Sequence, residues 1–458
     1  MIKTNYLAVP ALAIALGWAL PAQAQSADAA AVQHELAEMR AQMQRMAERI
    51  DTLEAQLGAA NARAATQAAA NAGSGSASRQ PPVEVTWKGA PELSAKGGWS
   101  FKPRGRAQID IGAIDAPAGL SGGTNPRGVS TEMRRLYLGF DGTMPGGFGY
   151  RVEADLAGSN VVLSDVYLTY QPSKELTLTL GQHKPLTGLD DMTSDLYTSM
   201  MERAAFTSAF GFEKRLGLSA TYATDSFLVQ GGVFSDDLAA LNSDTARNWS
   251  LDGRVVAMPK VGGGTLHLGL SAHVRDLNDA APTVRYRARP FLHTTDARLV
   301  DTGAFAATGE RSFGAELAYV AGRFHATAEG HVLTVRRPGQ PDPSFKGAFA
   351  EVGYLLTDDV TGYKAGTYDR IRPRKPLGQG GFGAVQVNAR YDWLDLTDAG
   401  SNGGRQQTMS LSVIWIPMDY VRFIANYGHI RLRSAPVTVA GNPDYSADAF
   451  GMRAQVDF

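Results

Sequence analysis

Three basic residues alternate along one short segment of the sequence, where they could bind or guide anions. Lys102, Arg104 and Arg106 are separated by Pro103 and Gly105. If the segment is a β-strand, the three side chains lie on one face, about 7 Å apart. Rows of Lys and Arg select anions in pores, and a guanidinium matches phosphate oxygens with a planar pair of donors. The segment, called here the basic ladder, therefore predicts an anion path.

Two further cations, Arg135 and Arg151, each begin an alternating segment and join the predicted path. Glu153 and Asp155 share a face with Arg151 and could pair with the basic ladder. Such pairs would hold the cations in place, but they would also cancel part of the field. An alternative is that the cations lie at the rim of a membrane protein and reach lipid headgroups. The sequence leaves these possibilities open.

A second alternating set of cations consists of Arg285, Arg287 and Arg289. We expect it to line the same path. Pro290 follows directly, which also fits the end of a strand or a loop.

The elements that must position these cations are short strands. From Trp99 to Phe458, alternating segments such as Leu176–Leu180 are separated by Gly, Pro, Asn and Asp clusters. The last segment, Phe450–Phe458, is apolar at every second position and ends on an aromatic residue. Tight turns such as 144–147 and longer polar segments such as 188–212 are typical of an outer-membrane barrel. About 360 residues at roughly 22 per strand predict a transmembrane antiparallel β-barrel of about 16 strands, an all-β fold over 99–458.

The N-terminus resembles a secretory signal peptide. Lys3 is followed by a mostly apolar stretch over 7–20 and by the small-residue cleavage pattern Ala22-Gln23-Ala24. This arrangement predicts a signal peptide over 1–24 and export from the cytoplasm.

A coiled-coil helix is predicted over 25–58, and it is expected in the periplasm. Apolar residues are spaced alternately four and three apart, which is a heptad seam that favours self-association. The seam residues are Val32, Leu36, Met39, Met43, Met46, Ile50, Leu53 and Leu57. Residues 59–98 follow; the stretch up to Pro82 is rich in Ala, Gly, Ser and Asn, and we expect a flexible linker over 59–98.

Composition argues against several other functions. The formal net charge of −1 does not suggest a nucleic-acid binder. No cysteine is present, so thiolate metal sites and a cysteine nucleophile are excluded. The segment 378–385 matches the glycine loop of kinases, but no lysine strand or catalytic loop accompanies it. We therefore expect no enzyme activity, no metal and no cofactor.

Several motifs resemble the phosphate-selective porin O and P family. The strand 176–180 continues into Gly181-Gln182-His183-Lys184-Pro185, a long loop follows, and the loop exits through Met201-Glu202-Arg203. Arg134-Arg135 opens an earlier strand, and the chain closes on Arg453–Phe458. The ordered series covers essentially 99–458.

The resemblance implies a homotrimer of 16-stranded barrels in the bacterial outer membrane. It also implies that the loop Gly188–Phe212 folds inward and forms a constriction. On that analogy Lys184 and Arg203 flank the loop, and Arg134 with Arg135 forms a basic pair near the constriction.

These observations lead to one main hypothesis and two rivals. The main hypothesis is passive diffusion of small anions, with phosphate or polyphosphate favoured, through a pore lined by Lys and Arg. The first rival is a general or sugar-permeable porin of the same fold. The second is a structural tether, in which the coiled coil contacts peptidoglycan or another periplasmic partner.

Overall fold

The computed structural model describes residues 83–239, 248–278 and 281–458, together with seven isolated helical residues between Gln44 and Ala59. The chain divides into two units, Met1–Gln80 and Pro81–Phe458. The predicted signal peptide lies outside the described residues, and so do all the apolar seam positions of the predicted coiled coil. Within the described residues, no helix is both long enough and apolar enough to cross a membrane.

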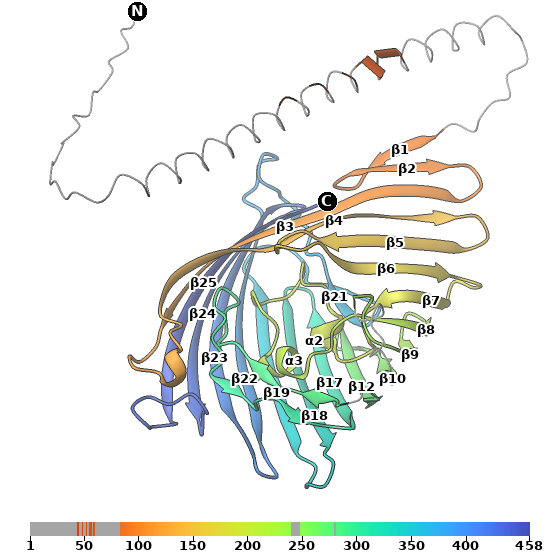
Figure 1. The fold of residues 1–458 in the computed structure, drawn as a ribbon. Coiled ribbons are helices and arrows are strands. Elements are labelled where there is room, and N and C mark those ends of the chain that lie inside the picture. Colours follow the sequence, from red (N-terminus) through yellow and green to blue (C-terminus); the bar gives the residue numbers. More distant parts are fainter. Residues whose placement is uncertain are drawn as a thin grey trace, which may run out of the picture. The chain divides into compact units, whose positions relative to one another are not determined.

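Sixteen antiparallel strands close into a barrel, which confirms the predicted fold class. Each strand pairs with the next along the chain, and the ring closes because β25 pairs with β3 (Figure 1). A closed barrel can cross lipid because all the backbone groups between its strands are paired. The barrel strands are β3 (Trp99–Asp115), β4 (Gly128–Met144), β5 (Phe148–Asp155), β6 (Val162–Tyr170), β7 (Leu176–His183), β8 (Arg215–Ala223), β9 (Phe227–Phe234), β10 (Trp249–Ala257), β12 (Gly264–Asp276), β17 (Gly309–Ala321), β18 (Phe324–Arg336), β19 (Ser344–Leu355), β22 (Ala384–Asp398), β23 (Ser401–Met418), β24 (Val421–Arg433) and β25 (Tyr445–Asp457).

The two faces of the strands follow the alternation in the sequence. On β25, Phe450 and Met452 are exposed on the outer surface, whereas Arg453 and Asp457 are buried inside. On β3, Ile109 is exposed outside, and the basic ladder lies on the inner face. The period of two therefore separates a lipid-type surface from a polar interior.

The two ends of the barrel differ in the length of their connections. At one end, called the short-turn end, two or three residues join β4 to β5, β17 to β18 and β23 to β24. At the other, called the long-loop end, extended segments join β7 to β8 and β12 to β17. In outer-membrane barrels the short turns face the periplasm.

One connection at the short-turn end is long. Residues 356–383, between β19 and β22, form a hairpin of β20 (Gly362–Lys364) and β21 (Thr367–Asp369). Its Tyr363 hydroxyl hydrogen-bonds the buried His267 imidazole of β12 at 2.6 Å, and Gly366 accepts a 2.9 Å hydrogen bond from Arg254 of β10. The hairpin therefore lies inside the barrel, against the interior face of β10 and β12.

The segment 188–212, called here the lumen loop, also lies inside the barrel. It contains the short helices α2 (Leu189–Met192) and α3 (Ala205–Phe210). The Asp190 amide donates to Glu329 of β18 at 2.8 Å, and the Ala205 amide donates to Asp392 of β22 at 2.7 Å. This placement agrees with the inward loop that the family resemblance implies.

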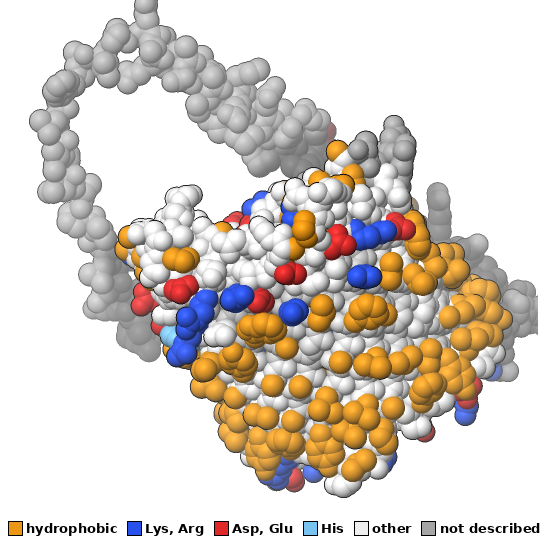
Figure 2. Space-filling model, turned by 90° about the horizontal axis from the view of Figure 1, so that it is seen from below, with side chains coloured by type: hydrophobic (Ala, Val, Ile, Leu, Met, Phe, Trp, Pro, Cys, Tyr) orange, Lys and Arg blue, Asp and Glu red, His pale blue; other side chains and the backbone are white. Residues whose placement is uncertain are grey.

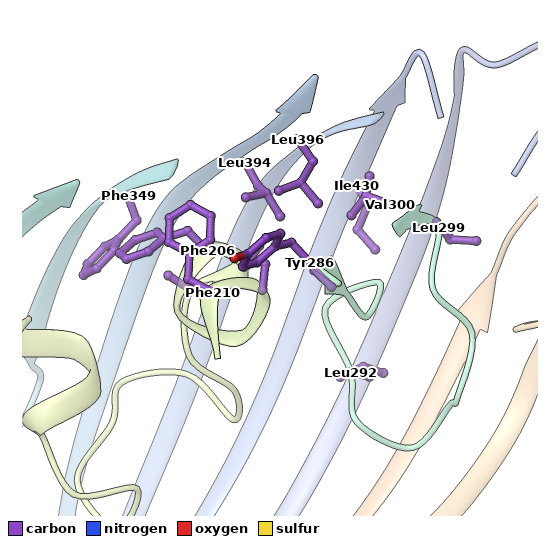
Figure 3. Close-up of a cluster of buried hydrophobic side chains, with 14 of the residues drawn as sticks. Phe206, Phe210, Tyr286, Leu292, Leu299, Val300, Phe349, Leu394, Leu396 and Ile430 are labelled. Atoms are coloured by element: carbon purple, nitrogen blue, oxygen red, sulfur yellow. The ribbon is translucent and has the colours of Figure 1, made fainter. Parts of the chain in front are cut away.

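The apolar core lies within the barrel (Figure 3). Phe206 and Phe210 of α3 pack with Tyr286 and Leu299 of the β12–β17 connection against apolar side chains that point inward from the strands. Those inward residues include Phe349, Leu394, Leu396 and Ile430. The interior is therefore apolar around α3 and the β12–β17 connection, whereas the hairpin β20–β21 lies on polar wall residues such as His267 and Arg254.

The folded unit begins before the predicted boundary at residue 99. β1 (Glu84–Trp87) and β2 (Pro91–Ala95) form a hairpin, and β2 pairs with the first residues of β3. Val85 lies opposite Leu93, and Leu93 lies opposite Phe101, so an apolar row continues from β3 across the hairpin. Cross-strand apolar pairs of this kind stabilise a sheet, and residues 83–98 are therefore not part of a flexible linker.

We predict that Gly347→Ala weakens the packing of α3 against β19. A Cβ atom at Gly347 would lie 2.1 Å from the Cβ atom of Phe206, so the loop or the strand must shift. Overpacking of this kind costs about 1–3 kcal/mol. Urea unfolding in detergent measures the loss, and Gly330→Ala is the control because its Cβ would meet nothing closer than 3.4 Å. Equal stability of both variants would contradict the described packing.

Candidate functional site: a charged cavity beside the lumen loop

A cavity of about 1200 Å³ lies between the lumen loop and the interior face of β3–β9. The hairpin β20–β21 and α3 cover the interior face on the other side of the barrel. The open part of the interior therefore lies between the lumen loop and the barrel wall of β3–β9.

Seven of the predicted cations line this cavity. They come from the basic ladder, from the neighbouring strands and from the two ends of the lumen loop. The seven are Arg104, Arg106, Arg134, Arg135, Arg151, Lys184 and Arg203. Arg104 and Arg203, 99 positions apart in the sequence, share this site because the lumen loop lies against the neighbouring strands that carry the wall arginines.

Four predicted cations are not among the lining residues. Lys102 faces the interior nearer the short-turn end, where it lies opposite Asp141 in the register. Arg285, Arg287 and Arg289 do not belong to a barrel strand, because they lie in the β12–β17 connection. Arg285 pairs with Asp301 at 2.5 Å in an exposed position, while the intervening Tyr286 packs into the apolar core.

A β-bulge brings two consecutive arginines into the cavity. In a regular strand, Arg134 and Arg135 would point to opposite faces. Gln108 of β3 lies opposite Arg135, but the next residue, Ile109, lies opposite Met133, so Arg134 is the extra residue of a bulge. Bulges redirect side chains in this way. A second register shift between β5 and β6 adds Ser164 beside Asp165 in the same cavity lining.

Carboxylates bridge these arginines in pairs. Glu153 accepts from Arg104 at 2.9 Å and from Arg106 at 3.0 Å. Asp195 of the lumen loop pairs with Arg106 and, at 2.6 Å, with Arg135 of β4.

Glu202, seven residues after Asp195 in the lumen loop, forms a similar bridge. It accepts from Arg134 at 2.9 Å and from Arg453 of β25 at 2.7 Å. Asp195 and Glu202 therefore fix the lumen loop to the arginine-bearing wall of β3, β4 and β25.

This charged and buried environment shifts the pKa values of Asp195 and Glu202 in the lumen loop and of Lys184 just before it. Burial alone would raise the pKa of Asp195, but Arg135 and Arg106 lower that pKa well below its usual range. The same competition holds the pKa of Glu202 well below its usual range, through Arg134 and Arg453. Both carboxylates therefore stay ionised in mildly acidic solution. Burial lowers the pKa of Lys184 to about 8, helped by the nearby cation Arg203.

Among the charged residues of the site that sequence reasoning missed, Asp195, Glu202 and Lys214 make direct ion pairs with the cavity lining or the barrel wall. Two acids inside a loop that is expected to fold against cations are a usable signal for Asp195 and Glu202. Lys214 pairs with Asp165 at 2.6 Å, and nothing in the local sequence marks that contact. The bulge at Arg134 was also hidden, because an unpaired residue has no sequence signature of its own.

The fold and the site together define a class of protein. A closed barrel with a lipid-type outer surface, an inward loop and a polar cavity along that loop is a porin channel of the bacterial outer membrane.

Comparisons with known proteins agree with this class. The family model described as phosphate-selective porin O and P matches residues 101–458. An uncharacterised protein of Caulobacter vibrioides is 41% identical over 450 residues, which cover 94% of this chain and 90% of that protein. Porin O of Pseudomonas aeruginosa is 25% identical over 399 residues, with coverage of 79% and 89%. The chain therefore belongs to the phosphate-selective porin O and P family.

Solved structures support the fold alone. In-vitro folded OmpT of Vibrio cholerae aligns with a TM-score of 0.54 at 14% identity, covering 80% of this chain and 99% of that one. The trimer form of the same protein aligns with a TM-score of 0.51 at 15% identity, with coverage of 79% and 100%.

We predict that a rise in pH from about 7 to about 9 weakens any preference of the channel for anions. Lys184 loses its positive charge as the pH passes about 8, because its pKa is lowered to that value. Lys184→Arg keeps its charge over this range and should remove that component of the pH dependence. Reversal potentials in a KCl gradient measure the preference at each pH. The same pH response in both proteins would contradict the role of Lys184.

Proposed function

We propose that this porin is a passive channel for small anions and that phosphate or polyphosphate solutes are favoured. The observation that carries the proposal is the arginine wall of the cavity. Arg104, Arg106, Arg134, Arg135 and Arg151 line one side of a space that is large enough for a hydrated anion.

The arginines keep donors for a solute although they are paired with carboxylates. A guanidinium has five N–H donors, and carboxylates engage two of the nitrogens on each of Arg104 and Arg106, so donors remain. Arg151 donates to Asp141 at 3.2 Å and approaches Asp165 at 4.0 Å. Its side chain is 30% exposed, so it can meet a solute. The carboxylates hold each planar guanidinium group in place, and a phosphate can accept hydrogen bonds from the N–H donors that remain.

A second candidate is a general porin for neutral polar solutes, including sugars. The observation that favours it is the balance of charge among the described lining residues, where eight cations face seven carboxylates. Tyr137 and Tyr167 also line the cavity and offer rings against which a sugar can pack. Liposome swelling with sugars and with phosphate esters separates the two candidates, because a general porin passes both at rates set by size.

Two proposals concern assembly. We expect a homotrimer, as the family resemblance implies, and one similar solved structure is a trimer form.

We also retain the proposal that residues 25–58 form a coiled coil that contacts peptidoglycan or another periplasmic partner. Deletion of 32–57 should leave single-channel conductance unchanged and alter trimer stability or envelope anchoring. If neither trimer stability nor anchoring changes, the coiled coil has no such role.

We predict that the triple variant Arg104→Gln, Arg134→Gln and Arg151→Gln lowers the anion-to-cation permeability ratio by about tenfold. Each charge on this partly exposed wall contributes on the order of 0.5 kcal/mol, and about 1.4 kcal/mol corresponds to a factor of ten. Reversal potentials across planar bilayers measure the ratio, and titration with phosphate tests block of the chloride current.

The matched control is Arg285→Gln, Arg287→Gln and Arg289→Gln, which removes the same number of charges from residues outside the cavity lining. It should keep most of the selectivity. A wild-type channel that prefers cations, or a chloride current that phosphate does not block, would contradict the proposal.

A further inference from the structure

The outer surface of the barrel carries a group of cations near the long-loop end of β17–β24. Their strands otherwise present apolar residues on this side, and Figure 2 shows blue Lys and Arg side chains bordering the orange apolar surface. The group, called here the outer basic belt, consists of Arg311, Lys346, Arg405, Arg431 and Arg433, all exposed.

The register places most of the outer basic belt on one line. Lys346 of β19 lies opposite Asp395 of β22, Asp395 lies opposite Arg405 of β23, and Arg405 lies opposite Arg433 of β24. Arg431 is two residues closer to the middle of the same strand. From β17 to β24 the belt extends roughly 25 Å, since neighbouring strands are about 4.8 Å apart.

The belt has an excess of positive charge. Arg405 pairs with Asp395 at 2.7 Å, and Arg433 approaches Asp444 at 3.9 Å. Arg311, Lys346 and Arg431 form no ion pair with any residue that the structure describes. These three outward-facing cations are therefore available to an anionic partner from outside the chain.

The strands that flank this sector, β10 and β12 on one side and β3 and β4 beyond β25 on the other, carry no such row of cations on the outer faces of their described residues. The outward residues near the long-loop ends of β3, β4, β10 and β12 include Ile111, Val129, Trp249 and Val274, and all four are exposed and apolar. Among the described residues, the row of outward strand cations on β17–β24 therefore does not continue onto these flanking strands.

The belt continues directly into an apolar surface. Closer to the middle of the barrel on the same strands, two residues from Arg311 and four from Arg405 and Arg431, Phe313 is 60% exposed, Met409 is 52% exposed and Tyr427 is 45% exposed. A partner that fits both regions must combine an anionic head with hydrocarbon chains, which is the chemistry of a membrane lipid. A free anion would meet the cations alone.

We infer that the outer basic belt is a binding site for the phosphorylated headgroup of an anionic lipid in the membrane leaflet at the long-loop end. The unpaired guanidinium groups of Arg311 and Arg431 and the ammonium of Lys346 contact the phosphates, and the acyl chains lie along the apolar surface below. The site is separate from the cavity, so it does not depend on which solute passes through the channel.

Native mass spectrometry of the purified full-length protein in a non-ionic detergent tests the site. The probes are lipid A with two phosphates, the same lipid without phosphates, and phosphatidylcholine. Wild-type protein should retain the diphosphorylated lipid preferentially, and inorganic phosphate should not displace it. The triple variant Arg311→Gln, Lys346→Gln and Arg431→Gln should bind that lipid about a hundredfold more weakly.

The control variant Lys96→Gln, Lys174→Gln and Lys375→Gln removes the same number of exposed charges from the short-turn end. It should retain the lipid like the wild type, and a gel shift on heating confirms that each variant is folded. Equal retention by the wild type and the belt variant would overturn the inference. Equal retention of the phosphorylated and dephosphorylated lipids by the wild type would overturn it as well.

Discussion

A chain segment inside a barrel must find partners for its backbone hydrogen-bonding groups, and the lumen loop finds them on the wall. Arg422 donates to the carbonyl oxygens of Leu196 and Thr198, and Arg453 donates to that of Met201. The amide groups of Asp190 and Ala205 in the loop donate to the wall carboxylates Glu329 and Asp392. An unpaired buried backbone group costs free energy comparable to a lost hydrogen bond, so these contacts decide where the loop lies. The shape of the cavity and the positions of its charges depend on that placement.

The same constraint gives the arginines of the cavity two roles. Arg106 and Arg135 hold the lumen loop through Asp195, and they also present the remaining donors to the cavity. Arg134 does the same through Glu202. The bulge that turns Arg134 inward serves both roles, since Arg134 pairs with Glu202 of the lumen loop and also lines the cavity. The carboxylates reduce the field of the cations but fix the guanidinium planes, which favours geometric recognition of an anion over simple attraction.

The strands and their faces could be predicted from the sequence because a period of two is local information. The terminal strand and the basic ladder both lie on the faces that the alternation indicates. The inward loop came from the family resemblance, since no local pattern distinguishes it from an exposed loop. Arg285, Arg287 and Arg289 show the limit of periodicity. Their alternation is real, but its buried face belongs to Tyr286 and Ala288, which pack into the core, so the arginines point away from it. The bulge at Arg134 depends on its register with β3, and the inward position of the hairpin β20–β21 depends on contacts with β10 and β12, and no local pattern in the sequence marks either.

Cysteine accessibility tests most directly whether anions pass through the cavity between the lumen loop and β3–β9. The chain has no cysteine of its own, so a single introduced thiol is unambiguous. Thr179 lines the cavity, whereas Thr327 lies beneath the hairpin β20–β21, where its hydroxyl pairs with that of Tyr368. In an open channel, an anionic methanethiosulfonate should modify Thr179→Cys faster than a cationic one and reduce the current, while Thr327→Cys should not respond. Faster modification by the cationic reagent, or a current that changes only with Thr327→Cys, would contradict the account.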